Sequence, residues 1–522
     1  MIRIFFFLLF SAATATAQYD ILIRNGRVVD GAGNPWYRAD VAVRGDSIAA
    51  MGALAGARAA VTIDAAGRVV APGFIDIHTH SRRGILEVPT AENYLRQGVT
   101  TLIEGNDGGS PLPLGPFLEQ VGARRLSVNF ASFVGHGSIR REIVGLANRR
   151  ATPDEMERMK QMTARAMQEG ALGLSTGLFY VPGNYAPTEE VIELARVAGR
   201  LGGMHISHMR NEADGVLDSV RETIAIGEKG GLPTQVTHHK AVGRPNHGRS
   251  VDTLRLVEEA RARGVDVTID QYPYTASSTG LTGLIPQWAQ EGGEAEMKKR
   301  FQDPATRARI KAGIVTNIVD NRGGGDPKNV VLANCAFDTS LNGKSLGQVT
   351  SERGRPPTPE NAADTALELL TRGSCQTVYH AINEADVERI LKYPWTMIGS
   401  DGEVPIFGKG VLHPRSYGTF ARVLGVYVRE RQVLSLEDAI RKMSSFPAQR
   451  MGFADRGVLR PGLKADLVIF DPATVADRAV FGNPHQYAVG FSHVLVNGEV
   501  VLEDARITER RPGRILWGPA RR

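Results

Sequence analysis

The sequence predicts an α/β protein: a (β/α)8 TIM-like barrel with a small β-sandwich domain built from both ends of the chain. Short apolar strands alternate with amphipathic helical segments through the middle of the chain, and short strands with turns fill both ends. Histidines and carboxylates gather where the central strands end. A chain of 522 residues is also longer than one ordinary core, which agrees with a large domain and a smaller one.

Residues 1–17 have the pattern of a secretory signal peptide. One early positive charge, Arg3, precedes a short apolar stretch and the small-residue ending Ala15-Thr16-Ala17. The stretch is too short for a transmembrane helix, and no later segment is long and apolar enough to span a bilayer. We therefore expect cleavage before Gln18 and export, to the periplasm if the source is a Gram-negative bacterium. The alternative is a retained membrane anchor.

The predicted β-sandwich comes from residues 18–70 and 457–522. The first range contains "YDILIRNGRVVDGAG" and "DVAVRGDSIAAMG", and the second contains "GVLRPGLKADLVIFDP" and "HVLVNGEVVLED". Both ranges alternate short apolar runs with glycine-containing turns, which is typical of short strands. Two β-rich ends of one chain can fold together into a single small domain.

The predicted barrel covers residues 71–415, and residues 416–456 are its helical C-terminal part. Eight apolar segments are predicted as its strands: GFIDIHTH, VTTLIEGND, LSVNFASFVGH, GALGLSTG, GGMHISH, PTQVTHH, VDVTIDQYP and WTMIGSD. Amphipathic segments such as "TPDEMERMKQMTARAMQEG", "TEEVIELARVAGRLG" and "VDTLRLVEEARARG" separate them. The rhythm breaks near residues 281–364, which predicts an insertion or lid between the seventh and eighth strands. Chemistry in such barrels sits at the C-terminal ends of the strands.

Charge and cysteine content exclude two classes of protein. The net charge of +6 is spread along the chain and forms no basic stripe, so nucleic acid is not an expected partner. Two cysteines, Cys335 and Cys375, are too few for a disulfide scaffold. They form either one bridge or two buried free thiols.

The first predicted strand ends in His78 and His80, whose side chains point the same way because faces alternate along a strand. Other strand ends carry further candidates: Glu104 and Asp107 on the second, His208 on the fifth, His238 and His239 on the sixth, and Asp401 on the eighth. Imidazole and carboxylate groups with an open position for water are the ligands of a catalytic divalent metal, zinc first. His239 and His205 lie at odd offsets from the ligand histidines, so we expect both to point away.

The ordered motifs resemble those of the amidohydrolase superfamily and, within it, the D-aminoacylase (N-acyl-D-amino-acid deacylase) family. The matching segments are APGFIDIHTH, GALGLSTGLFYVPG, SHMRNE, VTHHK, PYTASST, IGSDG, HPRSYGTF and GVLRPGLKADLVIFDP. The resemblance implies a metal held after the second strand and by His208 and His238. It implies a second, weaker metal position at His78 and His80.

One position departs from the family pattern. Where the family usually has Gly-Asn-Cys-Gly, this chain has Gly105-Asn106-Asp107-Gly108. Asp107 replaces a thiolate with a harder carboxylate, which can hold or bridge zinc but also suits manganese or a paired-metal site. Glu104 is a competing candidate. Metal identity and count, one or two ions, therefore stay open.

Further roles follow from the resemblance. Asp401 is expected to take a proton from the metal-activated water and pass it to the leaving nitrogen; the alternative is an N-cap of the next helix. Arg210 and Lys240 are expected to hold a substrate carboxylate. Tyr180 and Tyr274 match positions that line the substrate pocket.

The predicted function is hydrolysis of the amide bond of N-acyl-D-amino acids, small molecules whose stereochemistry is implied by the resemblance alone. One alternative is a cyclic-amide hydrolase of the dihydroorotase or hydantoinase type, or a dipeptidase. A non-catalytic barrel scaffold is a third hypothesis, which the presence of every candidate ligand disfavours. No membrane contact is expected after signal cleavage.

Overall fold

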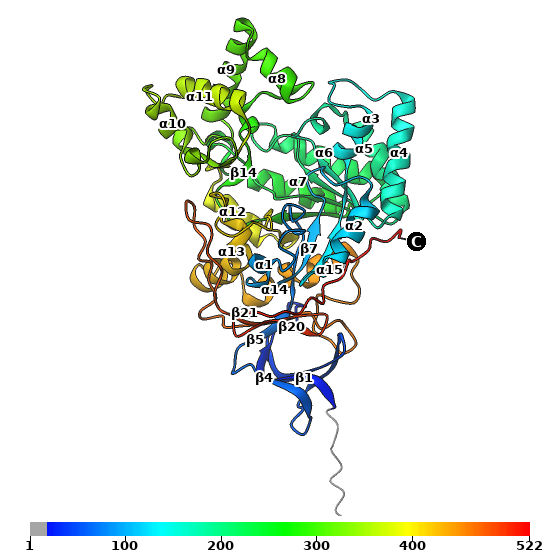
Figure 1. Ribbon diagram of the computed structural model, residues 1–522. Helices are drawn as coiled ribbons and strands as arrows, with labels where there is room; N and C mark the ends of the chain where they lie inside the picture. Colours follow the sequence, from blue (N-terminus) through cyan, green and yellow to red (C-terminus); the bar gives the residue numbers. More distant parts are fainter. Residues whose placement is uncertain (1–17, 522) are drawn as a thin grey trace, which may run out of the picture.

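The computed structural model describes residues 18–521 (Figure 1). The predicted signal peptide, residues 1–17, lies outside the described residues. Within 18–521, every helix falls short of the length and apolar character needed to cross a membrane.

Both ends of the chain contribute strands to one nine-stranded sheet. Its strands are β1 (Tyr19–Val28), β2 (Tyr37–Arg44), β3 (Ser47–Gly52), β4 (Ala59–Asp64), β5 (Val69–Pro72), β18 (Leu467–Phe470), β19 (Phe491–Val496), β20 (Glu499–Glu503) and β21 (Arg506–Ile507). Strand β5 joins the two ends, because it pairs in parallel with β1 and antiparallel with β18. The strands are continuous in one sheet, and a division into the two facing sheets of a sandwich is not shown.

Each of the eight segments predicted as barrel strands contains parallel strand structure. The strands are β6 (Phe74–Asp76), β7 (Val99–Glu104), β8 (Asn129–Ser132), β9 (Val134–Gly135), β10 (Gly173–Gly177), β11 (Met204–His208), β12 (Thr234–Val236), β13 (Val267–Gln271) and β17 (Thr396–Ile398). They form a three-stranded sheet, β6-β7-β8, and a six-stranded sheet in the order β17-β13-β12-β11-β10-β9. The α/β class is confirmed, but these ladders do not close into a continuous barrel.

Helices lie between the parallel strands as the periodicity predicts. The main ones are α2 (Leu114–Ala123), α4 (Pro153–Gln168), α5 (Thr188–Arg200), α6 (Val216–Gly230), α7 (Ser250–Ala262) and α12 (Glu384–Lys392). The start of α4 is set by its sequence: the Thr152 hydroxyl accepts from Glu155 N, and the Glu155 carboxylate accepts from Thr152 N at 2.8 Å. Pro153 follows at the first helical position, where a missing N–H costs nothing. Farther along, α13 (Arg415–Arg422), α14 (Leu436–Met443) and α15 (Ser445–Met451) follow the last parallel strand.

A separate unit interrupts the alternation between β13 and β17. It contains the antiparallel strands β14 (Ser277–Gly280), β15 (Val330–Cys335) and β16 (Cys375–Tyr379) and the helices α8 (Glu294–Arg300), α9 (Pro304–Val319), α10 (Leu346–Glu352) and α11 (Pro359–Arg372). These elements surround a hydrophobic core of their own and project beyond the parallel strands in Figure 1. We call residues 277–379 the insert.

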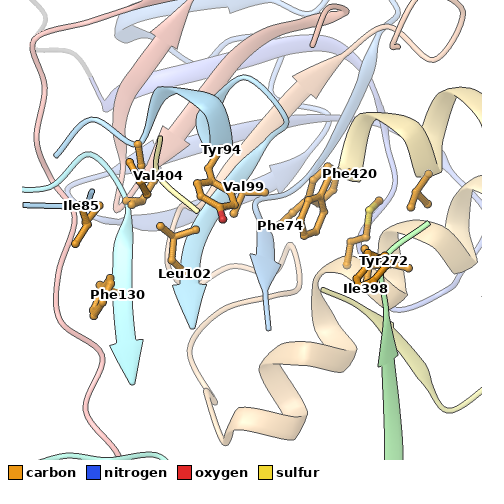
Figure 2. Packing of buried hydrophobic residues seen from close by; sticks show 14 of the residues in the cluster. Phe74, Ile85, Tyr94, Val99, Leu102, Phe130, Tyr272, Ile398, Val404 and Phe420 are labelled. Carbon is orange, nitrogen blue, oxygen red and sulfur yellow. The ribbon is translucent and has the colours of Figure 1, made fainter. Parts of the chain in front are cut away.

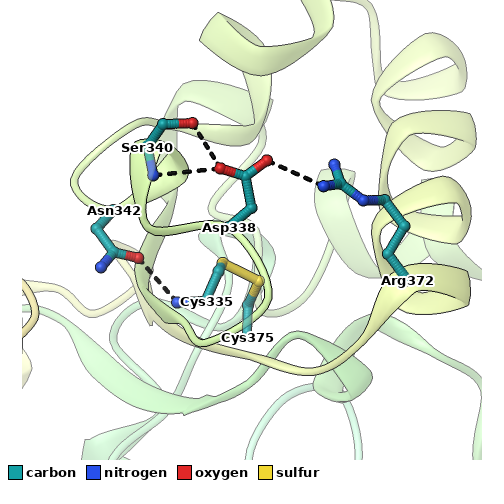
Figure 3. The surroundings of a disulfide bond; sticks show 6 residues. All are labelled: Cys335, Asp338, Ser340, Asn342, Arg372 and Cys375. Carbon is teal, nitrogen blue, oxygen red and sulfur yellow. Dashed lines mark hydrogen bonds and ion pairs between the residues drawn. A yellow bond between two sulfur atoms is a disulfide. The ribbon is translucent and has the colours of Figure 1, made fainter.

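A disulfide links Cys335 and Cys375 inside the insert (Figure 3). The two residues are opposite one another where β15 pairs with β16. This resolves the alternative left open by the sequence in favour of a bridge. Nearby, Asp338 pairs with Arg372 of α11 at 3.1 Å, so the turn after β15 is also tied to that helix.

Phe74, at the start of β6, joins the parallel strands to the nine-stranded sheet. Its ring lies beside that of Phe420 in α13 (Figure 2). The ring centroids are 5.9 Å apart, and those of Phe470 and Phe491 lie 6.5 and 6.3 Å from the Phe74 ring. All four side chains are buried. Aromatic packing of this kind fixes where the first parallel strand begins and therefore where its far end points.

Candidate metal centre

The first parallel strand leads into two histidines that point to the same side of the chain. Thr79 N donates to Ile103 O at 2.9 Å and His80 N donates to Gly402 O at 2.7 Å, so the chain stays extended beyond β6. The hydroxyl of Thr79 turns away and also donates to Ile103 O. His78 and His80 therefore share one face, with ring centroids 5.7 Å apart.

A tight turn after β7 presents Asp107. In it Gly105, Asp107 and Gly108 have φ of +81°, +57° and +72°, a region that favours glycine and tolerates aspartate. A Cβ on Gly108 would lie 2.5 Å from the backbone N of Gly177, so glycine is required there. The turn brings the Asp107 carboxylate back over the strand ends.

Asp107 lies between two pairs of histidines. Its Oδ1 is 3.4 Å from Nε2 of both His78 and His238. Its Oδ2 is 3.3 Å from Nε2 of His80 and 3.4 Å from Nδ1 of His208. Burial alone raises the pKa of Asp107, but the facing imidazoles hold that pKa well below its usual range. The residue is thus a carboxylate that faces both pairs.

Asp401 reaches the cluster from the end of the eighth strand. Its Oδ1 is 3.0 Å from His80 Nε2, and its Oδ2 is 2.6 Å from Arg415 Nη1. Burial raises the pKa of Asp401, but Arg415 and His80 hold it well below the usual range. The next helix, α13, follows Pro414, so Asp401 is not its N-cap.

The cluster fits a divalent metal. One donor atom from each of His78, His80, Asp107 and Asp401, and likewise from Asp107, His208 and His238, lies within 4.8 Å of the others in its group. Among the described residues, His78 Nε2, Asp107 Oδ1 and Asp401 Oδ1 are buried with no hydrogen-bond partner. Buried polar atoms are ordinarily paired. Imidazole nitrogens and carboxylate oxygens are ligands of zinc and similar ions.

A cavity of about 560 Å³ opens onto this cluster. His80, Asp107, Tyr180 and Arg415 are among its lining residues. The Tyr180 ring lies 4.7 Å from that of His208, and its hydroxyl is 3.2 Å from Thr279 Oγ1. The structure therefore places the predicted Tyr180 beside the candidate metal donors, at the wall of a space large enough for a small molecule.

The two predicted substrate-binding cations are held by carboxylates. Arg210 donates to Glu222 of α6 at 2.9 and 2.8 Å and to two backbone carbonyls, so it is not brought to the cluster. Lys240 is buried beside His238, with its Nζ 2.5 Å from Oε1 of Glu212. Neither side chain lines the 560 Å³ cavity.

Tyr274 is also not brought to the cluster. It packs under the guanidinium of Arg422, 5.0 Å from the ring centroid. Tyr272 lies nearer, with Lys240 Nζ 5.5 Å and the Arg415 guanidinium 4.9 Å from its ring centroid. Of these two tyrosines, Tyr272 is the one beside the charged groups of the site.

Three other polar residues near the strand ends have partners outside the cluster. Glu104, the competing carboxylate, forms an ion pair with Arg82 and belongs to neither donor group. His239 Nε2 is 2.7 Å from Thr253 of α7. His205 Nδ1 is 2.8 Å from Thr234. Both histidines point away from the cluster, as alternation along the strands predicts.

Sequence reasoning missed three charged residues of the site. Arg415 and Glu212 fall inside the quoted segments "HPRSYGTF" and "SHMRNE", and a charge within a recognised motif was the available signal. Asp270 interrupts the apolar strand β13, and a buried acid in such a strand needs a partner. Its Oδ1 accepts from His238 N at 2.7 Å and lies 3.4 Å from His78 Nδ1.

The chain is similar to known proteins over most of its length. The amidohydrolase family model matches residues 61–281 and 348–502. A D-aminoacylase of Alcaligenes xylosoxydans xylosoxydans is 38% identical, over 95% of this chain and 97% of that protein.

Two solved structures are similar over nearly their full length. The N-acyl-D-glutamate deacylase of Bordetella bronchiseptica, in complex with zinc and a phosphonate that mimics the tetrahedral intermediate, has a TM-score of 0.82 and 36% identity, covering 96% of this chain and 99% of that one. A D-aminoacylase with a binuclear metal centre has a TM-score of 0.81 and 37% identity, covering 95% and 99%.

Proposed function

The chain belongs to the amidohydrolase family, among the relatives of the D-aminoacylases, and from this we propose that it hydrolyses the amide bond of N-acyl-D-amino acids. The observation that carries the proposal is the set of six candidate metal donors, of which His80 and Asp107 line the 560 Å³ cavity. The products are a carboxylate and a free D-amino acid. The D configuration is supported by the names of the relatives alone, since no residue of the site has been assigned to select it.

His208, His238 and Asp107 would hold one ion, and His78, His80 and Asp401 would hold a second, with Asp107 between the two. Zinc is the first candidate, and the carboxylate of Asp107 makes the site compatible with manganese as well. A bound ion of this kind lowers the pKa of a water molecule and polarises the scissile carbonyl.

Asp401 is the group that moves the proton. Its Oδ1 faces the donors and its Oδ2 is held by Arg415, so the carboxylate is charged and oriented. It accepts the proton of the attacking water as the new C–O bond forms, and it returns that proton to the nitrogen as the C–N bond breaks. Arg415 keeps the base charged between turnovers.

The substrate carboxylate binds at the cavity wall. We infer that Arg415 and Tyr180 recognise it, because both line the cavity. Arg415 pairs with Asp401 through Nη1, so the donors that it can offer to a substrate carboxylate are those of Nε and Nη2. Arg210 is committed to Glu222 and Lys240 to Glu212, so these cations would need to exchange partners to reach it.

A substrate panel tests the function. The purified protein is assayed with N-acetyl-D- and N-acetyl-L-amino acids, a cyclic ureide and dipeptides, as isolated, after chelation, and after return of zinc or manganese. We expect hydrolysis of the N-acetyl-D series that is lost on chelation and restored by metal. Turnover confined to the ureide or to dipeptides would favour those activities instead. A metal-bearing protein inert to every compound would favour a binding role.

The strands also support a closed barrel. The isolated bridge Thr79–Gly402 lies between the ends of β6 and β17, the two outer parallel strands. Leu172 N donates to Ser132 O at 2.9 Å across the other gap, between β8 and β10. We propose on these contacts that the two parallel sheets act as one (β/α)8 barrel. The nine-stranded sheet, to which both ends of the chain contribute, is proposed as the small β-sandwich domain.

We also propose that the protein is exported. The signal-peptide pattern of residues 1–17 supports this, as does the disulfide between Cys335 and Cys375, because structural disulfides persist in oxidising compartments. Fractionation of the source cells with an antibody against the protein, together with N-terminal sequencing, tests it. We expect the periplasmic or extracellular fraction and a new N-terminus at Gln18.

A further inference from the structure

The carboxylate of Glu212 lies near the ring nitrogens of His208 and His238 that point away from Asp107. His208 presents Nδ1 and His238 presents Nε2 to Asp107, each at 3.4 Å. The other ring nitrogens lie near Glu212: His238 Nδ1 is 3.3 Å from Oε1, and His208 Nε2 is 3.8 Å from Oε2. Lys240 Nζ, which pairs with Glu212, also lies 2.8 Å from His238 Nδ1. The Glu212 side chain is fully buried.

Two metal-binding imidazoles require an acceptor near the ring nitrogen that faces away from the metal. A neutral imidazole that binds a metal through one nitrogen carries its proton on the other, and that N–H needs an acceptor. Within the described residues, Glu212 is the one carboxylate within 4.0 Å of His208 Nε2 and of His238 Nδ1. Glu212 is thus the carboxylate nearest to both nitrogens, and the His208 Nε2 atom, which is buried with no hydrogen-bond partner among the described residues, has this carboxylate as its nearest acceptor side chain.

Two cations hold Glu212 in place. Lys240 Nζ lies 2.5 Å from Oε1, and Arg322 Nη2 lies 3.3 Å from Oε2. Arg322 comes from the insert, and its guanidinium also lies 4.4 Å from the ring centroid of Phe179. The Phe179 ring in turn stacks on His208, with centroids 5.7 Å apart. The insert therefore contacts the surroundings of both histidines.

We propose that Glu212 is a positioning residue that orients His208 and His238 together for the metal, and that Arg322 of the insert braces it. The proposal rests on the proposed metal-dependent function. In this proposal Lys240 balances the buried charge of Glu212 and does not bind the substrate. The metal affinity of the site then depends on the contact between Glu212 and Arg322 of the insert.

The test measures zinc affinity rather than activity. Metal-free protein is prepared with a chelator, and the zinc dissociation constant is determined by competition with a chromogenic chelator. Glu212→Gln keeps the shape of the side chain but offers one acceptor oxygen to two N–H groups. We expect zinc binding about 10- to 100-fold weaker than in the wild type.

Glu190→Gln is the matched control. Glu190 is a buried carboxylate with the same kinds of partner, His136 Nε2 at 3.0 Å and Arg140, and it belongs to neither donor group. We expect this variant to lose stability and keep the wild-type zinc affinity. Equal zinc affinity in Glu212→Gln and the wild type would overturn the proposal, as would an equal loss in both variants. A wild-type protein that binds no zinc or manganese would reject the proposed function itself.

Two further variants keep the proposal testable if Glu212→Gln does not fold. Glu212→Asp retains the charge that Lys240 and Arg322 require but withdraws the carboxylate by one methylene, so we expect a weaker zinc site in a folded protein. Arg322→Met is expected to weaken zinc binding severalfold, and Arg322→Lys to recover part of the loss. Wild-type affinity in both Glu212→Asp and Arg322→Met would contradict the positioning role.

Discussion

At the scale of single residues, Asp401 has a left-handed backbone conformation and a carboxylate that forms an ion pair with Arg415. Its φ is +53°, in the left-handed region that Asp and Asn enter more readily than most residues. Arg415 holds one oxygen and leaves the other toward the histidines. Asparagine can therefore replace it without disturbing the backbone, which makes the chemical role separable from the structural one.

We expect Asp401→Asn to lower kcat by about two orders of magnitude or more, because the amide cannot accept a proton. The melting temperature should change little, since Asp401 caps no helix. Steady-state kinetics and thermal unfolding of the metal-loaded variant check this. A variant that kept its rate and lost its stability would show that Asp401 is structural.

Asp107 and Glu104 offer a matched pair of carboxylates three positions apart. Asp107 faces four imidazoles, whereas Glu104 is paired with Arg82. We expect Asp107→Ala to lose bound metal and Glu104→Gln to retain it. Metal analysis after dialysis decides between them. Metal lost only from the Glu104 variant would show that Glu104, and not Asp107, is the metal ligand.

Asp107→Cys introduces the softer ligand at the same place. Thiolate prefers zinc over manganese, so we expect the variant to bind zinc more selectively when both ions are offered together. Competition between equal zinc and manganese, read by elemental analysis, measures this. Unchanged selectivity would mean that Asp107 does not contact the ion.

At the scale of elements, the disulfide closes a stretch of the insert with a sequence separation of 40 residues. A cross-link over that length stabilises a fold by about 4 kcal/mol, chiefly by restricting the unfolded chain. We expect the double variant Cys335→Ala, Cys375→Ala to unfold at a lower temperature and to be cut by protease within the insert. The wild type treated with reductant serves as the control, and identical melting in all three samples would contradict the prediction.

Most of the fold could be predicted from the sequence because each parallel strand is an apolar run that ends in polar residues. Two predicted site residues, Arg210 and Tyr274, are not brought to the cluster, because each lies beyond the last residue of its strand, where the alternation of faces no longer holds. Strand β11 ends at His208, so Arg210 lies in the following loop and turns toward Glu222. Strand β13 ends at Gln271, and the turn after it places Tyr272 by the site while Tyr274 packs elsewhere.

His78 and His80 share one face although β6 also ends before them, because backbone hydrogen bonds to Ile103 and Gly402 keep that segment extended. Such bonds join segments far apart in the chain, so a sequence does not reveal them. The same holds for Arg322, which comes from the insert and reaches Glu212 only in the folded protein. The pairing of the two cysteines likewise depended on the register of β15 against β16.

At the scale of the whole molecule, a cluster of aromatic rings joins the parallel strands to the nine-stranded sheet. Phe491 is buried there against Phe74 and Phe470. Truncating a buried phenylalanine costs about 3–5 kcal/mol, so we expect Phe491→Ala to lower the melting temperature markedly. The exposed Phe407, with 52% of its surface accessible, is the control residue for the same substitution. Equal melting of the two variants would show that the ring cluster does not hold the parts together.

The order of the strands along the chain also constrains how this molecule is made. Strand β5 is synthesised early, but its neighbour β18 emerges only after all the parallel strands have been translated. At about 5–20 residues per second, β5 waits on the order of tens of seconds without that neighbour. An arrested ribosome carrying the chain up to the end of β17 would display an unfinished sheet edge and the uncovered ring of Phe74. The nascent chain thus exposes this edge until β18 has left the ribosome, and it exposes part of the Phe74 ring until Phe491 has followed.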